Sequence, residues 1–480
     1  MTRSESPAKT PRAKLRAPTS GLQKIYACSL LITVLSAPAA FPQSAPAPVN
    51  NDLAAGMDKV AGEVYKSGAP GAAVIAVKDG RVVFRKGYGV ANMELNVPIG
   101  PEMVFRLASI TKQFTAAAVM MLVEQRKLSL QDDITKFFPD YPTGGKRITV
   151  ENLLTHTSGI RDYLEKLWPQ RMREDFRPER LIDLFKNDGL EFEPGTRDSY
   201  SNSNYVLLGV IIEKLSGKEY GRFIEENIFK PLGMRHSYYE RVQEIIPDRV
   251  YGYARAGGGF VDAAYVSMPQ LYAAGGLCSS VDDLALWDAA AYSDKLLKRT
   301  SWERLFTPYK LANGEASAYA SGWAISQFEG RTIASHTGGI PGFTTYVLRM
   351  PRDHVYVAIL SNDRTAEVQP EYVAKRLAAI AIGKPITEPK IIKLDARLLD
   401  EYVGQYQEGA GDVTTVRREG DRLFAQSAGD PEVELFPTSE ETFLVKAYDA
   451  RISFVKGPQG DVTEMTVSVG GRDISLRKIK

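Results

Sequence analysis

Four Ser-x-x-Lys pairs occur in the chain, and they matter because a neutral lysine beside a serine can take the serine's proton. They begin at Ser6, Ser109, Ser453 and Ser475. The first lies in a basic N-terminal segment. The last two lie in strand-like runs, where residues i and i+3 project to opposite faces. Only Ser109 and Lys112 open a long apolar segment with helical spacing, where i and i+3 share a face. We expect nucleophilic chemistry there, with an N-cap serine beside a solvated lysine as the alternative.

Two further polar motifs each occur once. Tyr200-Ser201-Asn202 lies between an irregular loop and an expected helix, and His336-Thr337-Gly338-Gly339 comes at the end of an expected strand. The chain has no Gly-x-Ser-x-Gly, the nucleophile turn of α/β-hydrolases. It also has no His-Glu-x-x-His, no paired cysteines and no histidine cluster, so we expect neither a metal nor a cofactor.

The three motifs follow one another in the order Ser-x-x-Lys, Tyr-x-Asn, His-Thr-Gly. In this order they resemble the superfamily of serine β-lactamases, penicillin-binding proteins and D-Ala-D-Ala carboxypeptidases. The resemblance is to the tyrosine-containing branch, which includes class C β-lactamases, esterases and D-aminopeptidases. It covers roughly residues 52–382 and includes three subsidiary stretches, at 153–159, 231–234 and 275–277.

The resemblance implies roles for particular residues. Ser109 would be the nucleophile that forms an acyl-enzyme. Lys112 and Tyr200 would take its proton and return it to the leaving group, and which of the two is the base stays open. Asn202 would orient the substrate carbonyl or amide. The backbone N–H groups of Ser109 and Gly339 would form the oxyanion hole.

The rest of the His-Thr-Gly motif would bind substrate. Gly338 and Gly339 would let the substrate approach the strand closely, and Thr337 would lie beside them. His336 departs from the lysine usual in penicillin-recognising branches. A histidine is mostly uncharged at neutral pH, which weakens the expectation of carboxylate-bearing substrates. We expect a structural role for His156 and a packing role for Cys278.

The residue pattern predicts strands at both ends of this region and helices in its middle. A hairpin is expected over 73–84 around Asp79-Gly80, and strands are expected at 332–335, 344–349 and 355–360. Helices are expected at 52–66, 110–125, 204–216 and 371–382. These elements predict an α+β (α/β layered) fold, with one antiparallel sheet, packing helices and a helical insertion. Segment 161–190 is either a lid over the cleft or a solvated cap.

The C-terminal part has a different pattern. Residues 383–394 look like a linker, and seven short strand-like runs follow between 413 and 476. They predict a small all-β sandwich or barrel over 395–480. It resembles the lipocalin-like appendages of some D-peptidases in the same superfamily.

The N-terminus resembles a secretory signal peptide. Residues 1–40 hold six of the 60 basic residues and one of the 58 acidic residues, followed by an apolar run from Ile25 to Leu35. This run is too short to span a bilayer. We expect cleavage near Ala39 or Ala40, a spacer over 41–51 and a catalytic domain over 52–382. The mature net charge would be −3, with Cys278 as the only cysteine.

The sequence therefore predicts a secreted or periplasmic serine hydrolase without cofactor, acting on small esters or D-amino-acid-containing peptides. The near balance of 60 basic and 58 acidic residues argues against nucleic acid as a partner. No stable membrane anchor is expected, and a homo-oligomer is compatible with the sequence. A β-lactamase or D-Ala-D-Ala carboxypeptidase is the alternative within the class, and a non-hydrolytic binding protein is the alternative outside it.

Overall fold

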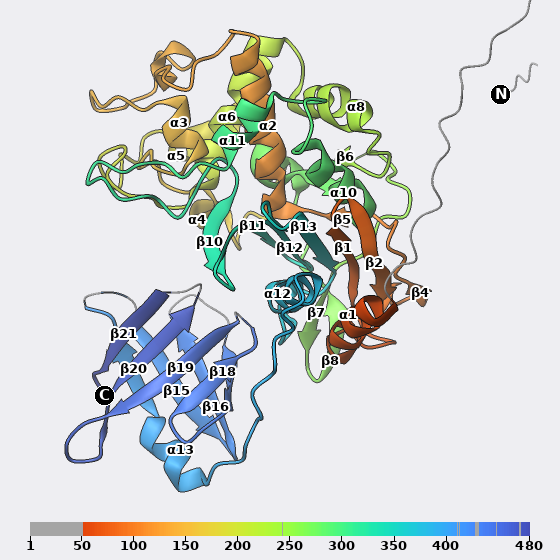
Figure 1. The fold of residues 1–480 in the computed structure, drawn as a ribbon. Coiled ribbons are helices and arrows are strands. Elements are labelled where there is room, and N and C mark those ends of the chain that lie inside the picture. Colours follow the sequence, from red (N-terminus) through yellow and green to blue (C-terminus); the bar gives the residue numbers. More distant parts are fainter. Residues whose placement is uncertain are drawn as a thin grey trace, which may run out of the picture. The chain divides into compact units, whose positions relative to one another are not determined.

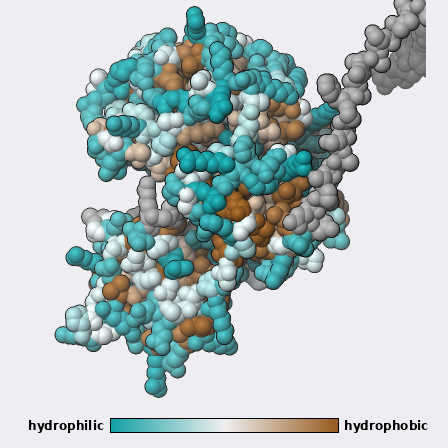
Figure 2. All heavy atoms as spheres, viewed as in Figure 1, coloured by the Kyte–Doolittle hydropathy of each residue, from teal (hydrophilic) through white to brown (hydrophobic). Residues whose placement is uncertain are grey.

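The computed structural model describes residues 51–241, 243–409, 411, 413–427, 432–447, 449–469 and 472–480. The expected signal peptide, and the expected spacer except Asn51, lie outside the described residues. Within the described part no helix is long and apolar enough to cross a membrane. Hydrophilic residues cover most of the face drawn in Figure 2.

A six-stranded antiparallel sheet joins the two ends of the first region, as expected (Figure 1). The contact that joins the two ends pairs β1 with β13, with Ala72 opposite Ser361. The strand order is β10-β11-β12-β13-β1-β2. The strands are β1 (Ala72–Lys78), β2 (Arg81–Tyr88), β10 (Ala324–Phe328), β11 (Arg331–Ile340), β12 (Phe343–Met350) and β13 (Val355–Ser361). The hairpin turn holds Asp79 and Gly80 at φ of 52° and 72°, as a type I′ turn requires.

Both faces of β1 are buried, because alternate residues of this strand enter different cores. Ala72, Val74 and Ala76 pack with helices α1 (Asn51–Val64) and α12 (Pro370–Ala381). Ala73 and Ile75 pack on the other side with α2 (Thr111–Glu124) and α10 (Val281–Ala290). The β1 sequence is accordingly a continuous apolar run rather than an alternating one.

The helical insertion packs on α2. Its longest helix, α6 (Asn202–Ser216), contacts α2 and α9 (Tyr272–Gly275), and Gly217 ends it at φ 69°. The other helices are η1 (Ala108–Ile110), η2 (Ile134–Lys136), α3 (Val150–Leu154), α4 (Leu164–Leu167), α5 (Pro178–Phe185), α7 (Tyr220–Ile224), η3 (Glu225–Phe229), α8 (Lys230–Leu232), η4 (Met268–Gln270) and α11 (Arg299–Leu305). The short strands are β3 (Val90–Asn92), β4 (Val97–Pro98), β5 (Phe105–Arg106), β6 (Tyr238–Tyr239), β7 (Tyr253–Ala256), β8 (Gly259–Asp262) and β9 (Leu277–Ser279).

The C-terminal region is a closed eight-stranded barrel, which decides between the two expected all-β forms. Seven of its strands contain the expected runs. The eighth, β14, carries a single apolar residue, Tyr406, and was not expected. The elements are α13 (Ala396–Tyr402), β14 (Gly404–Gln407), β15 (Val413–Glu419), β16 (Arg422–Ser427), β17 (Val433–Pro437), β18 (Thr442–Val445), β19 (Ala450–Lys456), β20 (Val462–Val469) and β21 (Arg472–Lys478). The α+β fold with an all-β C-terminal domain is thus confirmed.

Strand β11 is longer than the sequence predicts. It continues beyond Ser335 through His336-Thr337-Gly338-Gly339 to Ile340. Glycines have low strand propensity, but pairing with β12 holds them, with Gly338 opposite Thr345 and Gly339 opposite Thr344. The expectation that His336 ends the strand was therefore wrong.

Candidate active site

Ser109 lies in the short helix η1 that leads into α2. The residue before it, Ala108, has φ 49°, in the left-handed region that side chains rarely adopt. The turn is fixed from both sides. The Leu107 N–H donates to the Leu277 carbonyl at 2.9 Å, and the Thr345 hydroxyl donates to the Leu107 carbonyl at 2.9 Å. A strained turn held by two strands is a common setting for a functional side chain.

Lys112 is fully buried one helical turn after Ser109. Its Nζ donates to Ser109 Oγ at 3.2 Å, to Asn202 Oδ1 at 2.7 Å and to the Ala274 carbonyl at 2.9 Å. Burial lowers the pKa of Lys112 to about 7, although the carboxylate of Asp162 acts in the opposite direction. Near neutral pH a substantial fraction of Lys112 is therefore unprotonated and able to accept a proton.

Tyr200 reaches the other side of Ser109. Its hydroxyl donates to Ser109 Oγ at 2.7 Å, and its ring faces Lys112 Nζ at 4.7 Å. The residue is 40% exposed, and desolvation by the surrounding protein raises the pKa of Tyr200. The tyrosine thus stays protonated under conditions in which Lys112 loses its proton.

Asn202 connects this group to a carboxylate that the sequence did not single out. Its side-chain amide donates to Asp162 Oδ2 at 2.7 Å while its carbonyl oxygen accepts from Lys112. Asp162 also accepts from the Asn202 backbone N–H at 3.2 Å. Segment 161–190 therefore contributes at least one residue next to the candidate site. The sequence signal for Asp162 was its place in the charge-rich segment 161–190, three residues after the 153–159 stretch.

His336 is buried and uncharged. Its Nδ1 is 2.7 Å from the Thr337 carbonyl and its Nε2 is 2.7 Å from the Tyr319 hydroxyl. A carbonyl can only accept, so the proton resides on Nδ1, and Nε2 accepts from Tyr319. Burial and the nearby Lys112 lower the pKa of His336 to about 3. The neutral state agrees with the sequence expectation, and Tyr319 is a partner that the sequence did not indicate.

His156 packs beneath the tyrosine. Its ring lies 4.5 Å from the Tyr200 ring and 4.9 Å from the Tyr319 ring, centroid to centroid. Its Nδ1 accepts from the Ser201 backbone N–H at 3.1 Å, next to Tyr200 in the chain. This structural arrangement fits the expected role of His156 and adds that the support acts on Tyr200.

The far end of β11 has an open edge beside Ser109. Strand β10 pairs with β11 only as far as Ser335, so residues 336–340 have no strand partner on that side in the described part of the chain. Gly338 also packs closely against the turn that carries Ser109. A Cβ there would lie 2.2 Å from both the Leu107 carbonyl oxygen and Thr345 Oγ1. The role of Gly338 in substrate approach stays a prediction, and the structure adds a packing reason for glycine at this position.

We predict that Gly338→Ala destabilises the chain. Its Cβ would enter the turn that carries Ser109, and overpacking of this kind costs about 1–3 kcal/mol. Calorimetry should show a lower melting temperature, together with lost activity. Gly259→Ala is the comparison, because a Cβ there would meet nothing closer than the Ala256 carbonyl oxygen at 4.0 Å. A Gly338→Ala variant as stable as the wild type would contradict the packing explanation.

Cys278 is fully buried, and its thiol donates to Glu240 at 3.1 Å. Burial raises the pKa of the Cys278 thiol well above its ordinary value. It has the environment of a packing residue. No cluster of metal-ligating side chains occurs among the residues that the structure describes.

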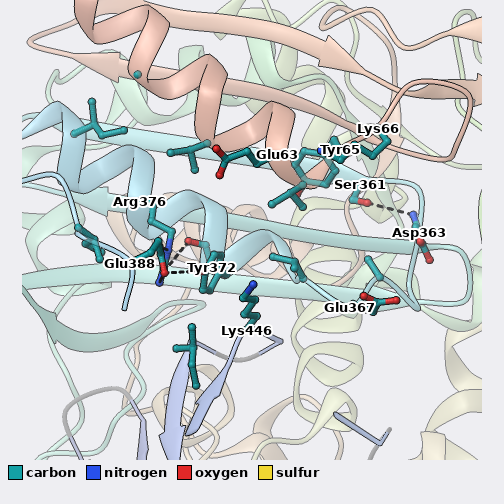
Figure 3. Close-up of a pocket in the computed structure, with 18 of the residues that line it drawn as sticks. Glu63, Tyr65, Lys66, Ser361, Asp363, Glu367, Tyr372, Arg376, Glu388 and Lys446 are labelled. Carbon is teal, nitrogen blue, oxygen red and sulfur yellow. Dashed lines mark hydrogen bonds and ion pairs between the residues drawn. The ribbon is translucent and has the colours of Figure 1, made fainter. Parts of the chain in front are cut away.

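A cavity of about 820 Å³ lies away from Ser109 (Figure 3). Residues of α1, α12 and the segment after β13 line it. One of the cations that line it, Arg376, is paired with Glu388 and Asp449. None of the candidate catalytic side chains lines this cavity, so volume alone does not identify the active site.

The comparisons with known proteins agree with the motifs. A family model described as Beta-lactamase matches residues 49–382. The chain belongs to the beta-lactamase family. A second model, described as a domain of unknown function, matches residues 388–478. The domain boundaries given above, 52–382 and 395–480, remain predictions from the sequence.

Two curated relatives of this beta-lactamase-family chain are informative. "Penicillin-binding protein 4*" of Bacillus subtilis (strain 168) is 31% identical over 429 residues, covering 84% of this chain and 94% of the relative. "D-aminopeptidase" of Gluconobacter oxydans (strain 621H) is 27% identical over 348 residues, covering 70% and 63%.

Among solved structures, the octameric penicillin-binding protein homologue from Pyrococcus abyssi has a TM-score of 0.63 and 29% identity, covering 89% of this chain and 99% of that one. The D-amino acid amidase from Ochrobactrum anthropi SV3 has a TM-score of 0.59 and 23% identity, covering 69% and 98%, which shows a shared fold. The chain is thus a beta-lactamase-family hydrolase related to penicillin-binding proteins and a D-aminopeptidase.

Proposed function

We propose that this protein is an exported serine hydrolase that works through an acyl-Ser109 intermediate. The observation that carries the proposal is the position of Ser109 Oγ, 2.7 Å from the Tyr200 hydroxyl and 3.2 Å from Lys112 Nζ. Nucleophile and base within hydrogen-bond reach, with the base oriented by a third group, is the arrangement that covalent catalysis requires. Asn202 is that third group, since it accepts from Lys112.

In this mechanism Lys112 is the base and Tyr200 passes the proton. Neutral Lys112 takes the Ser109 proton as Oγ attacks the substrate carbonyl carbon. The backbone N–H groups of Ser109 and Gly339 stabilise the resulting oxyanion. The bond to the leaving group then breaks, and the proton reaches the leaving nitrogen or oxygen through Tyr200. Water then attacks the acyl carbon while Lys112 and Tyr200 take its proton. The bond between the acyl carbon and Ser109 Oγ breaks, the proton returns to Oγ, and the acid product leaves.

Small esters and peptides with D-residues are the proposed substrates. The relationship to a D-aminopeptidase supports D-amino-acid chemistry. The uncharged His336 at the head of the third motif supports substrates that need no cation at that position. A β-lactamase or D-Ala-D-Ala carboxypeptidase is the second candidate, favoured by the relationship to penicillin-binding proteins.

Intact mass spectrometry separates these functions. The protein is exposed briefly, in parallel, to a β-lactam, a p-nitrophenyl ester and a D-amino-acid amide. A transient adduct with released product indicates a hydrolase for that substrate, and a lasting β-lactam adduct indicates a penicillin-trapped protein. Adduct formation that survives in Ser109→Ala, or no adduct and no product with any probe, would refute the proposal. The second result would favour a binding protein on the same fold.

Asp162 is proposed to tune the base. Its carboxylate raises the pKa of Lys112, so Asp162→Asn should lower that pKa below about 7. The acidic limb of the pH profile of kcat/KM should then move to lower pH. The amide variant keeps an acceptor for Asn202, which limits the loss of geometry. An acidic limb at the wild-type position would contradict this role.

Export and assembly are also proposals. Export rests on the signal-like residues 1–40, and N-terminal sequencing of the protein from the culture medium or periplasm tests it. A homo-oligomer is suggested by the octameric relative, and light scattering of the purified protein measures it.

Residues 383–394 are proposed as the linker between the two domains.

A further inference from the structure

Tyr205 presents its ring to the candidate base from helix α6. It lies three residues after Asn202, and residues three apart share one face of a helix. This face of α6 offers Lys112 the Asn202 oxygen at 2.7 Å and the Tyr205 ring, whose centroid is 5.4 Å from Lys112 Nζ. The face of an aromatic ring is negative and attracts a cation at this distance.

The Tyr205 hydroxyl is engaged with a different partner. It donates to the Leu154 carbonyl at 2.8 Å, and the whole residue is buried. Burial raises the pKa of Tyr205 well above its ordinary value, so the side chain carries no charge. The part of Tyr205 that acts on Lys112 is therefore the ring face.

The stretch 153–159 holds this ring in place. Its Leu154 accepts the hydroxyl hydrogen bond, and its His156 ring lies 5.2 Å from the Tyr205 ring, centroid to centroid. The His156 ring also packs on Tyr200, whose own ring faces the lysine at 4.7 Å. Both rings that face the lysine thus rest on one histidine, which gives this stretch a role at the site.

The charged and titratable groups around Lys112 come from several elements. The carboxylate of Asp162 favours the ammonium form. Burial lowers the pKa values of His156 and His336, so both are uncharged near neutral pH. Tyr200 stays protonated, because desolvation raises its pKa. Within these described surroundings, one carboxylate, two carbonyl oxygens and two ring faces oppose the cost of burying a charge.

We propose that Tyr205 is a positioning residue for the base, and that its ring face stabilises the positive charge that Lys112 gains when it takes the Ser109 proton. The proposal rests on the proposed function, since it concerns the same proton transfer. The proton leaves Ser109 Oγ for Lys112 Nζ as Oγ bonds to the substrate carbonyl carbon. Lys112 is neutral before this step and cationic after it, so the attraction to the ring grows as the transition state forms. An interaction of this kind speeds the step.

The test changes the charge distribution of the ring and keeps its shape. Variants of the full chain carry phenylalanine, trifluorophenylalanine or pentafluorophenylalanine at position 205, because fluorine withdraws electrons from the ring face. The pKa of Lys112 is measured by NMR titration of its ε-carbon, and Lys112→Arg assigns the signal. Tyr205→Phe should keep the pKa near the wild-type value. Pentafluorophenylalanine should lower it by about 0.5–1.5 pH units, with trifluorophenylalanine in between.

The pH profile of kcat/KM shows whether this interaction acts in the reaction. Pentafluorophenylalanine should move the acidic limb to lower pH by the same amount as the Lys112 pKa, because a less stabilised ammonium loses its proton more readily. A structural role of Tyr205 would lower the melting temperature without moving the limb. Trifluorophenylalanine, which is closer in size to phenylalanine, keeps the test valid if the larger ring disturbs packing.

Tyr356 is the matched control. It is a buried tyrosine on β13, opposite Val77, and its ring is not one of the two that face Lys112. The same fluorinated series at position 356 should leave both the Lys112 pKa and the acidic limb unchanged.

The proposal is overturned if the Lys112 pKa is equal in the phenylalanine and pentafluorophenylalanine variants, or if the control series shifts it as much. If the pKa falls as expected but the acidic limb does not follow, the ring face acts on Lys112 and the lysine is not the base. In that case it is the proposed function that fails.

Discussion

Ser109→Ala should abolish hydrolysis while leaving the fold intact. Without Oγ no acyl-enzyme forms, and loss of a serine nucleophile costs up to about 10⁶-fold in kcat in a well-studied protease. We expect kcat/KM to fall by at least about 10⁴-fold, measured with a p-nitrophenyl ester. The change in the free energy of unfolding should stay below about 1 kcal/mol, because the variant loses only hydrogen bonds to a half-exposed hydroxyl.

The chain contains its own controls for this experiment. Ser475 also belongs to a Ser-x-x-Lys pair, but it is exposed on β21 of the barrel. Ser475→Ala should keep wild-type activity. Residual hydrolysis near the wild-type rate in Ser109→Ala would refute the nucleophile assignment. A large drop in melting temperature would show that lost activity reflects unfolding instead.

The motifs and the main elements were predictable because they depend on local sequence. The spacing of Ser109 and Lys112 follows from helix geometry, and the hairpin at Asp79-Gly80 follows from turn chemistry. The layered fold followed from strands at both ends of the region. The barrel was predictable from regularly spaced short strands. Strand β14 was not predicted, because a strand rich in glycine and glutamine has little hydrophobic signal.

The supporting residues were not predictable, because tertiary contacts bring them in. Asp162 accepts a hydrogen bond from Asn202, but it lies in a segment that the sequence predicts only as a lid or a cap. Tyr319, which donates to His336, lies in an irregular stretch before β10. Gly338 could be recognised as a close-approach glycine, but only the structure shows that Leu107 is its neighbour.

These supporting contacts bear on which group is the base, a question that the motifs left open. Two groups flank Ser109, and their pKa values move apart: that of Lys112 falls to about 7 and that of Tyr200 rises. Pairs of titratable groups whose environments separate their pKa values reveal acid and base assignments. The desolvated lysine is thereby the better base and the tyrosine the better proton donor.

The pH profile and Lys112→Arg test this assignment together. If unprotonated Lys112 is the active form, log kcat/KM should rise with unit slope below pH 7 and level off above it, because its folded pKa is about 7. Arginine keeps the charge but does not lose its proton in this range, so Lys112→Arg should lose about 10³-fold in kcat/KM at pH 8. Lys456→Arg, in the barrel's Ser-x-x-Lys pair, should keep the wild-type profile. An acidic limb above pH 10 would instead identify Tyr200 as the base, because desolvation raises its pKa. An active Lys112→Arg variant would remove the lysine from proton transfer.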